Sequence, residues 1–223
     1  MEPTSQAKTL GTKAEQVRVC HLPLRYKVGA MATKSGTVSI GAKQAARTFH
    51  AVRFANDNGR TLNLFVTIDF TSLGIDPNDA SATFRQVWAR FSRWYADQRD
   101  RKGRPFGRFD AYAVHEHPTH GPRHVHWVMR APEGTEDEIE RVIRNRLEKL
   151  TGLACLGSAI DFRPVYSAGQ LAKYTLKGIA PAYARHFHMT AEDQGFVTGR
   201  RITISRSIGY AARQRAGWVR KRK

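Results

Sequence analysis

The spacing of apolar residues changes between two periods along the middle of the chain, and this feature constrains the possible folds most strongly. Every second residue from Leu62 to Phe70 is apolar, which is the period of a strand with one buried face. After a turn at residues 76–79, apolar residues recur at helical spacing from Phe84 to Tyr95. The chain is therefore expected to combine strands with helices.

The same change of period continues after this helix. Residues 109–116 and 123–130 have the pattern of two strands joined by a loop. Thr135 and Glu138 have the spacing of a capping box, which predicts that a helix begins there. Gly152 is expected to end that helix.

The last predicted elements are a strand at residues 160–165 and a helix that Ser167 caps and that runs to about Gly178. The full order is strand, helix, strand, strand, helix, strand, helix. This order predicts an α+β fold, in which helices pack on one face of a mainly antiparallel sheet.

The ordered pattern covers only part of the chain, so we expect three segments. Residues 1–58 are predicted to be a basic arm that is flexible or loosely docked, and residues 59–185 to be the core domain. Residues 186–223 are predicted to be a basic extension, because no acidic residue follows Asp193.

The charge of the chain indicates a polyanionic partner. Lys and Arg total 37 against 19 for Asp and Glu, which gives a net charge of +18. A nucleic acid is the expected partner, since its phosphates neutralise such an excess. No apolar run is long enough to cross a bilayer, and the first residues do not have the pattern of a secretory signal. Cys20 and Cys155 do not form a disulfide framework, so we expect a cytoplasmic protein without a membrane partner.

Five of the nine histidines lie between His115 and His126. On a strand, His124 and His126 point to one face, while the apolar side chains of Val125 and Trp127 point to the other. The two imidazoles are therefore expected to lie together and to hold one divalent metal ion. Exposed surface histidines are the simpler interpretation of the same pattern.

A third ligand follows if the two strands pair with Glu116 opposite His124, because the carboxylate then shares the imidazole face. Two imidazoles and a carboxylate leave positions open on Mg²⁺ or Mn²⁺ for a phosphate oxygen and water. With another register, His117 or His120 takes the place of Glu116. Structural zinc is disfavoured because no cysteine is close in sequence.

A tyrosine follows on the predicted helix after Ser167. Tyr174 and Lys177 lie three residues apart, so they share one side of that helix. A tyrosine hydroxyl, with an ordinary pKa of about 10, needs a nearby cation to act as a nucleophile. The pair is a candidate catalytic site, although an ordinary exposed tyrosine explains the same pattern.

These motifs together resemble those of the HUH endonucleases, and in particular of rolling-circle replication initiators with one catalytic tyrosine. The resemblance covers roughly residues 60–180. Its motifs are, in order, a strand at residues 65–71, Glu116 ahead of His124-Val125-His126, and Tyr174-Thr175-Leu176-Lys177.

The resemblance implies a five-stranded antiparallel sheet of RRM-like or ferredoxin-like topology with the metal site on the sheet. It implies Mg²⁺ or Mn²⁺ as cofactor and single-stranded DNA or an origin hairpin as substrate. Tyr174 would attack a phosphodiester, leaving a 5′-phosphotyrosyl link and a free 3′ hydroxyl. Lys177 matches the lysine that follows the tyrosine in the family.

Some features depart from larger members of this class. No Gly-x-x-x-x-Gly-Lys-Ser/Thr loop occurs in the sequence, so we expect a host helicase to unwind the DNA. Tyr166 is the nearest substitute for Tyr174 as nucleophile. His186 and His188 repeat the His-x-His pattern, but without an acidic residue upstream, and are expected to be surface or DNA-contacting residues.

Three alternatives to a replication initiator remain at this stage. A single-strand transposase or a relaxase would use the same chemistry on other DNA, although relaxases usually place the tyrosine before the histidines. A basic nucleic-acid-binding module would have incidental histidines and no activity. Basic residues along the chain are expected to contact DNA, namely Arg85, Arg93, Arg123, Lys173, Arg200, Arg201, Arg206, Arg213 and Arg215.

Overall fold

The computed structural model describes residues 35–153 and 157–218. The predictions for both cysteines and for the segments at residues 1–34 and 219–223 lie outside the described residues.

A five-stranded sheet forms the centre of the fold, with its strands in the order β5-β2-β4-β3-β7. All neighbouring strands pair antiparallel, which confirms the predicted sheet. The strands are β2 (Leu64–Asp69), β3 (Ala111–Glu116), β4 (His124–Met129), β5 (Ile160–Pro164) and β7 (Ile202–Ile204). A separate two-stranded sheet pairs β1 (Gly36–Thr37) with β6 (Val197–Thr198).

The helices are α1 (Ala42–Asp57), α2 (Pro77–Arg99), α3 (Glu136–Thr151), α4 (Ala168–Thr175), α5 (Pro181–Ala184) and α6 (Tyr210–Arg215), with short 3-10 turns at Gly157–Ala159 and Arg185–Phe187. The succession β2, α2, β3, β4, α3, β5 with the strand order β5-β2-β4-β3 is the ferredoxin-like arrangement. Strand β7 extends this sheet along the free edge of β3.

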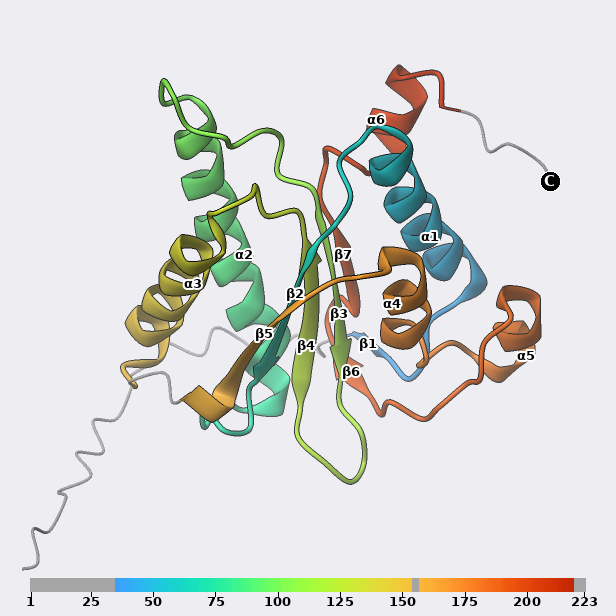
Figure 1. Ribbon diagram of the computed structural model, residues 1–223. Coiled ribbons are helices and arrows are strands. Elements are labelled where there is room, and N and C mark those ends of the chain that lie inside the picture. Colours follow the sequence, from blue (N-terminus) through green and yellow to red (C-terminus); the bar gives the residue numbers. More distant parts are fainter. Residues whose placement is uncertain (1–34, 154–156, 219–223) are drawn as a thin grey trace, which may run out of the picture. The chain divides into compact units, whose positions relative to one another are not determined.

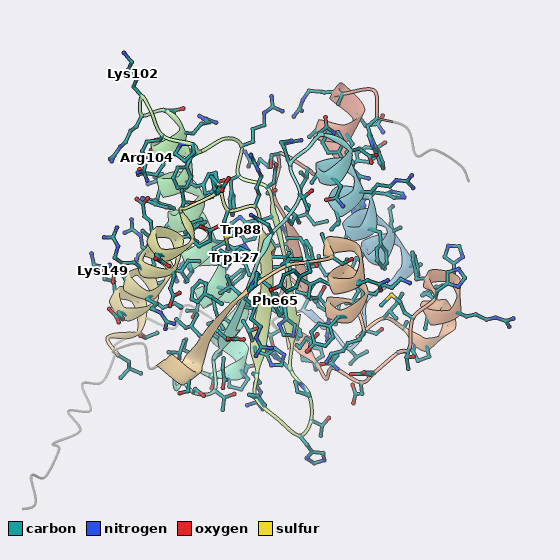
Figure 2. The ribbon with its side chains drawn as sticks, in the orientation of Figure 1. Phe65, Trp88, Lys102, Arg104, Trp127 and Lys149 are labelled. Atoms are coloured by element: carbon teal, nitrogen blue, oxygen red, sulfur yellow. The ribbon has the colours of Figure 1, made fainter. Side chains whose placement is uncertain are left out.

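One face of the sheet is covered by α2 and α3 (Figure 1). Its core is aromatic, because Phe84 and Phe91 of α2 pack edge-on against Trp127 of β4 at ring-centroid distances of 5.3 Å and 5.0 Å. Trp88 lies beside Trp127, with the ring centroids 5.4 Å apart (Figure 2). Alternation along β4 turns Trp127 to this face and His126 to the other.

The opposite face is also covered, which corrects the prediction that helices pack on one face only. Helices α1 and α4 lie on this side with α6 (Figure 1). The physical reason is that β3 is buried along all six residues, so Tyr112 and Val114 need a second apolar layer. His124 and His126 therefore lie on the face of the sheet that this second core covers.

Two segments predicted to be peripheral belong to this fold. Residues 42–57, assigned to a loosely docked arm, form α1, which buries Phe54 and Val52 in the second core. Residues 202–204, assigned to the basic extension, form the edge strand β7. In residues 42–57 many small or basic residues lie among few large apolar ones, which conceals the helical period, and residues 202–204 are too few to show a strand period.

The predicted helix ends are confirmed in part. Gly152 ends α3 in the left-handed conformation, with φ of 70°, and Ser167 caps α4 by accepting a hydrogen bond from the Gln170 amide. Thr135 forms no capping box, because its hydroxyl donates instead to the Pro132 carbonyl at 2.7 Å.

Helix α4 ends at Thr175, earlier than the predicted end near Gly178. Beyond it, the Gly178 carbonyl accepts from the Ile40 amide at 2.8 Å, and the Ala180 amide donates to the Ile40 carbonyl at 2.9 Å. These long-range hydrogen bonds replace those that would continue the helix.

Candidate active site

The paired strands β3 and β4 bring one carboxylate and two imidazoles together. Glu116 lies opposite His124 in the antiparallel register, as the sequence analysis assumed. His126 follows two residues later on the same face of β4. The prediction that these three side chains share a face is therefore confirmed.

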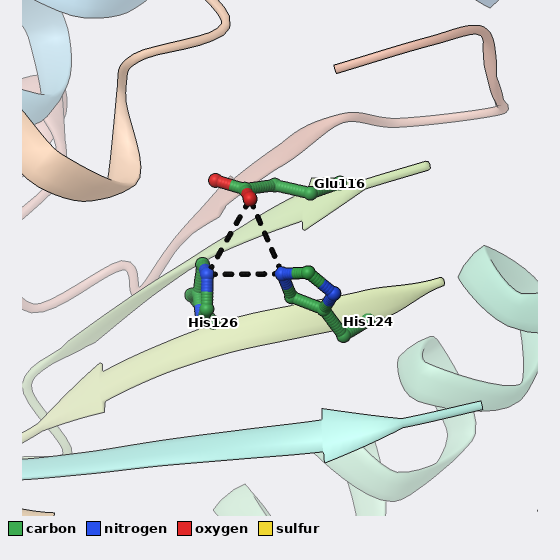
Figure 3. A group of neighbouring side chains, drawn as sticks. All are labelled: Glu116, His124 and His126. Atoms are coloured by element: carbon green, nitrogen blue, oxygen red, sulfur yellow. Dashed lines mark hydrogen bonds and ion pairs between the residues drawn. The ribbon is translucent and has the colours of Figure 1, made fainter. Parts of the chain in front are cut away.

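The ligand atoms of these three residues converge (Figure 3). His124 Nε2 lies 3.1 Å from His126 Nε2, and Glu116 Oε2 lies 3.2 Å from the first and 3.5 Å from the second. Glu116 and His126 are buried, while His124 is half-buried. We call Glu116, His124 and His126 the triad.

In each histidine of the triad, Nδ1 has a hydrogen-bond partner outside the triad. His124 Nδ1 lies 2.9 Å from the Pro122 carbonyl, and His126 Nδ1 lies 3.2 Å from the Thr67 hydroxyl. A carbonyl only accepts hydrogen bonds, so Nδ1 of His124 carries the proton and its Nε2 presents a lone pair. The same assignment for His126, with Thr67 accepting, turns both lone pairs towards Glu116.

This donor set fits a divalent metal ion. Two imidazole lone pairs 3.1 Å apart repel one another unless a cation or a proton lies between them. Glu116 Oε1 is buried and has no hydrogen-bond partner among the described residues, so the carboxylate has unused acceptor capacity. The triad can therefore hold a metal ion.

At neutral pH the protonation states of Glu116 and His126 favour the binding of a cation. Burial alone would raise the pKa of Glu116, but its contacts with His124 and His126, together with the positive charge of Lys177, lower it to about 2. Burial foremost, with the charges of His124 and Lys177, lowers the pKa of His126, although Glu116 acts in the opposite direction. The carboxylate is thus charged while the imidazole of His126 is neutral.

The predicted nucleophile lies next to the triad. The Tyr174 ring on α4 is 5.5 Å from the His126 ring, centroid to centroid, and half of its surface is exposed. Lys177 Nζ lies 4.8 Å from the centre of the Tyr174 ring and 3.5 Å from Glu116 Oε2. The tyrosine, the ammonium group and the triad therefore form one site.

No family model matches this sequence, and no curated protein or solved structure matches it either. The function of this site therefore has to follow from its own geometry. In the part of the chain that the structure describes, no helix is long and apolar enough to span a bilayer.

Two residues of this site were not predicted from the sequence. Thr67 lies opposite His126 in the register of β2 and β4, so the same alternation that placed the histidines could have placed it. Glu192 Oε2 lies 3.4 Å from Lys177 Nζ, and its amide donates to the Lys177 carbonyl at 2.8 Å. No local pattern marks Glu192, since it comes from a loop.

The alternative ligands and the alternative nucleophile lie elsewhere. His117 is buried on the side of His115, with the two rings 6.3 Å apart, and His120 is exposed in the hairpin loop, so the geometry favours Glu116 as third ligand. His186 and His188 are exposed surface residues. Tyr166 is 94% exposed and precedes α4.

Seven of the predicted DNA-contacting residues are accessible. Arg123 and Lys173 are partly exposed, and the exposed ones are Arg85, Arg93, Arg200, Arg206 and Arg215.

Arg201 and Arg213 are buried, which corrects their assignment as DNA contacts. The Arg201 guanidinium donates to the carbonyls of Thr37 at 2.7 Å and Gln194 at 3.4 Å, so it ties the small sheet to the neighbouring loop. Arg213 packs over the Trp218 ring at 5.7 Å. Basic sequence patterns do not distinguish such structural arginines from exposed ones.

Buried His115 should make the fold sensitive to acid. Burial foremost, with the charge of Arg201 and neighbouring histidines, lowers its pKa from 6.5 to about 3. Between these values the unfolded chain binds a proton that the folded chain does not, so the stability present above pH 6.5 is lost as the pH falls towards 3. The loss is about 1.4 kcal/mol per pH unit at most.

His115→Phe should reduce this slope, because a phenyl ring can keep the contacts with Phe70 and Phe84 without titrating. The measurement is the free energy of unfolding in urea at about pH 7 and about pH 5, in the presence of a chelator. Equal pH slopes for the parent and the variant would contradict the prediction.

Proposed function

We propose that this protein nicks and rejoins single-stranded DNA through a 5′-phosphotyrosine intermediate and so starts rolling-circle replication of a plasmid or phage. The observation that carries the proposal is the position of Tyr174, half exposed and in ring contact with His126 of a triad that can hold a metal ion. A merely structural tyrosine has no need of such a neighbour.

The residues divide the chemistry between them. The Tyr174 oxygen attacks the scissile phosphorus, its proton passes to water, and a new oxygen–phosphorus bond replaces the bond to the 3′ oxygen, which leaves as a hydroxyl after taking a proton from water. The Lys177 ammonium beside the ring stabilises the negative charge on the phenolate. Rejoining is the reverse reaction, in which a 3′ hydroxyl attacks the phosphotyrosine.

Lys177 is suited to an electrostatic role. Burial alone would lower its pKa, but the nearby Glu116, Tyr174 and Glu192 raise it. It therefore stays charged, and it cannot serve as the base that removes the tyrosine proton. Glu192 is a second carboxylate within ion-pair distance of the ammonium, so Lys177 contacts Glu116, Glu192 and the Tyr174 ring.

The triad would hold Mg²⁺ or Mn²⁺, which supplies Lewis-acid polarisation of the scissile phosphate when bound. Nitrogen and oxygen donors without a thiolate support this choice over structural zinc. Single-stranded DNA or an origin hairpin would be the substrate, and the charge of +18 supports such a partner. A host helicase would supply unwinding, and the setting would be the cytoplasm.

A covalent adduct tests this function directly. The full-length protein is incubated with a labelled pool of single-stranded oligonucleotides and Mn²⁺, and the products are separated on a denaturing gel. We expect protein-linked DNA that disappears when EDTA replaces the cation. Salt-sensitive binding without any adduct at any cation concentration would instead identify a non-enzymatic nucleic-acid-binding module.

Lys177→Gln should slow adduct formation by about 10²-fold, because the phenolate loses its neighbouring positive charge. The affinity for Mn²⁺ should not fall, since Lys177 is not a metal ligand. Rates are measured as the initial appearance of adduct on the gel at saturating DNA.

Lys173→Gln is the matched control, because it removes a lysine four residues earlier in the same segment that has no ion pair with Glu116 in the described residues. Equal rates for the Lys173 and Lys177 variants would contradict the role given to Lys177.

A further inference from the structure

A basic pocket lies on the other side of the sheet from the triad. Its volume is about 570 Å³, and it is lined by residues of α2, by residues from β6 to just beyond β7, and by Ser35. We call it the arginine pocket, after Arg85 of α2, Arg200 of the loop between β6 and β7, and Arg206 beyond β7.

The charge of the arginine pocket is not compensated by the protein. None of its lining residues, all of which the structure describes, is Asp or Glu. Arg85, Arg200 and Arg206 form no ion pair within residues 35–153 and 157–218, unlike Arg60, which pairs with Asp110 at 2.8 Å. Three arginines that line one pocket without a carboxylate favour an anion as ligand, and phosphate matches the fork geometry of a guanidinium group best.

The wall beside these arginines is aromatic and rigid. Trp88 is half-buried and offers its ring to the pocket, and it lies 5.9 Å, between ring centroids, from Phe84, which is buried. Trp88 is fixed in turn by Phe109 and Trp127, at 5.2 Å and 5.4 Å between ring centroids. A fixed aromatic wall beside a phosphate site suits a ligand that carries a flat apolar group next to its phosphate.

We propose that the arginine pocket binds a nucleoside phosphate, with the phosphate between the arginines and the base against the aromatic wall. The volume lies in the range of small-ligand sites. The nucleoside phosphate is either one nucleotide unit of a DNA strand or a free nucleotide. Because α2 covers the face of the sheet that the triad does not use, this binding is independent of the proposed nicking chemistry.

The test uses the full chain with Tyr174→Phe and EDTA, so that no cleavage takes place. Binding of deoxyadenosine monophosphate is measured by calorimetry, with inorganic phosphate as competitor, and binding of a labelled single-stranded oligonucleotide by fluorescence anisotropy. Arg85→Gln/Arg206→Gln is compared with Arg90→Gln/Arg101→Gln, which removes the same charge from exposed positions outside the pocket.

Two results support the proposal. If the mononucleotide binds and the pocket variant weakens it by at least about tenfold, the ligand is a free nucleotide. If only the oligonucleotide binds, and the pocket variant weakens it by at least about tenfold more than the control does, the ligand is a unit of a DNA strand.

Equal effects of the two double variants on every probe would overturn the proposal. Should the pocket variant fail to fold, Arg200→Gln provides the same comparison from an exposed loop position. The adduct assay described above remains separate, so loss of the nicking function and loss of the pocket are distinguishable.

Discussion

Tyr174→Phe is expected to abolish the covalent protein–DNA adduct while leaving the affinity for DNA and for Mn²⁺ unchanged. The variant removes one hydroxyl group and keeps the ring that contacts His126 and Lys177. A phenyl ring has no oxygen to attack phosphorus, so adduct formation should fall below detection, by at least about 10³-fold. Because the side chain is half exposed, the variant is expected to keep the fold.

Tyr166→Phe is the matched control for this prediction. Tyr166 is a tyrosine of the same segment that is almost fully exposed and lies before Ser167, the cap of α4. Its variant should form the adduct at the parent rate. The opposite outcome, adduct from the Tyr174 variant and none from the Tyr166 variant, would transfer the nucleophile to Tyr166.

His126→Gln is expected to weaken Mn²⁺ binding and to eliminate most adduct formation. His126 is the most deeply buried imidazole of the triad, and its Nε2 faces both His124 Nε2 and Glu116 Oε2. Replacing it leaves two ligands and should lower the affinity for the cation by more than about 10²-fold. Calorimetric titration of the metal-free protein measures this effect.

Thr67→Val is also expected to weaken Mn²⁺ binding, but by less than His126→Gln does. Valine matches threonine in shape but cannot accept from His126 Nδ1, so the imidazole loses the partner that orients its Nε2. The expected loss of affinity is about 10- to 100-fold, smaller than for His126→Gln.

His120→Gln is the control, because His120 is exposed and lies outside the triad. Equal metal affinities for the His126 and His120 variants would show that the triad is not the binding site.

Much of the site could be predicted because it depends on local alternation. Side chains on a strand point alternately to two faces, so the pairing of β3 with β4 determines that Glu116, His124 and His126 lie together. Tyr174 could be placed on a helix but not near the triad, since that distance depends on how α4 packs across the sheet.

The features of the fold and of the site that the sequence did not predict depend on long-range packing. Nothing in the sequence near Arg201 separates an arginine buried against carbonyls from an exposed one, because both follow basic neighbours. Helix α1 is rich in alanine and basic residues, so its buried stripe through Phe54 is weak in sequence. The second layer of helices follows from the burial of β3 on both faces, and the sequence does not show that burial.

The central claim is that the Tyr174 oxygen becomes bonded to DNA beside the triad. The most direct measurement is mass spectrometry of the adduct after nuclease and trypsin digestion. Trypsin cleaves after Lys173 and Lys177, so Tyr174 and Tyr166 fall in different peptides. A nucleotide on the peptide that contains Tyr174 is the predicted result, and a nucleotide on any other peptide, or on none, would contradict the account.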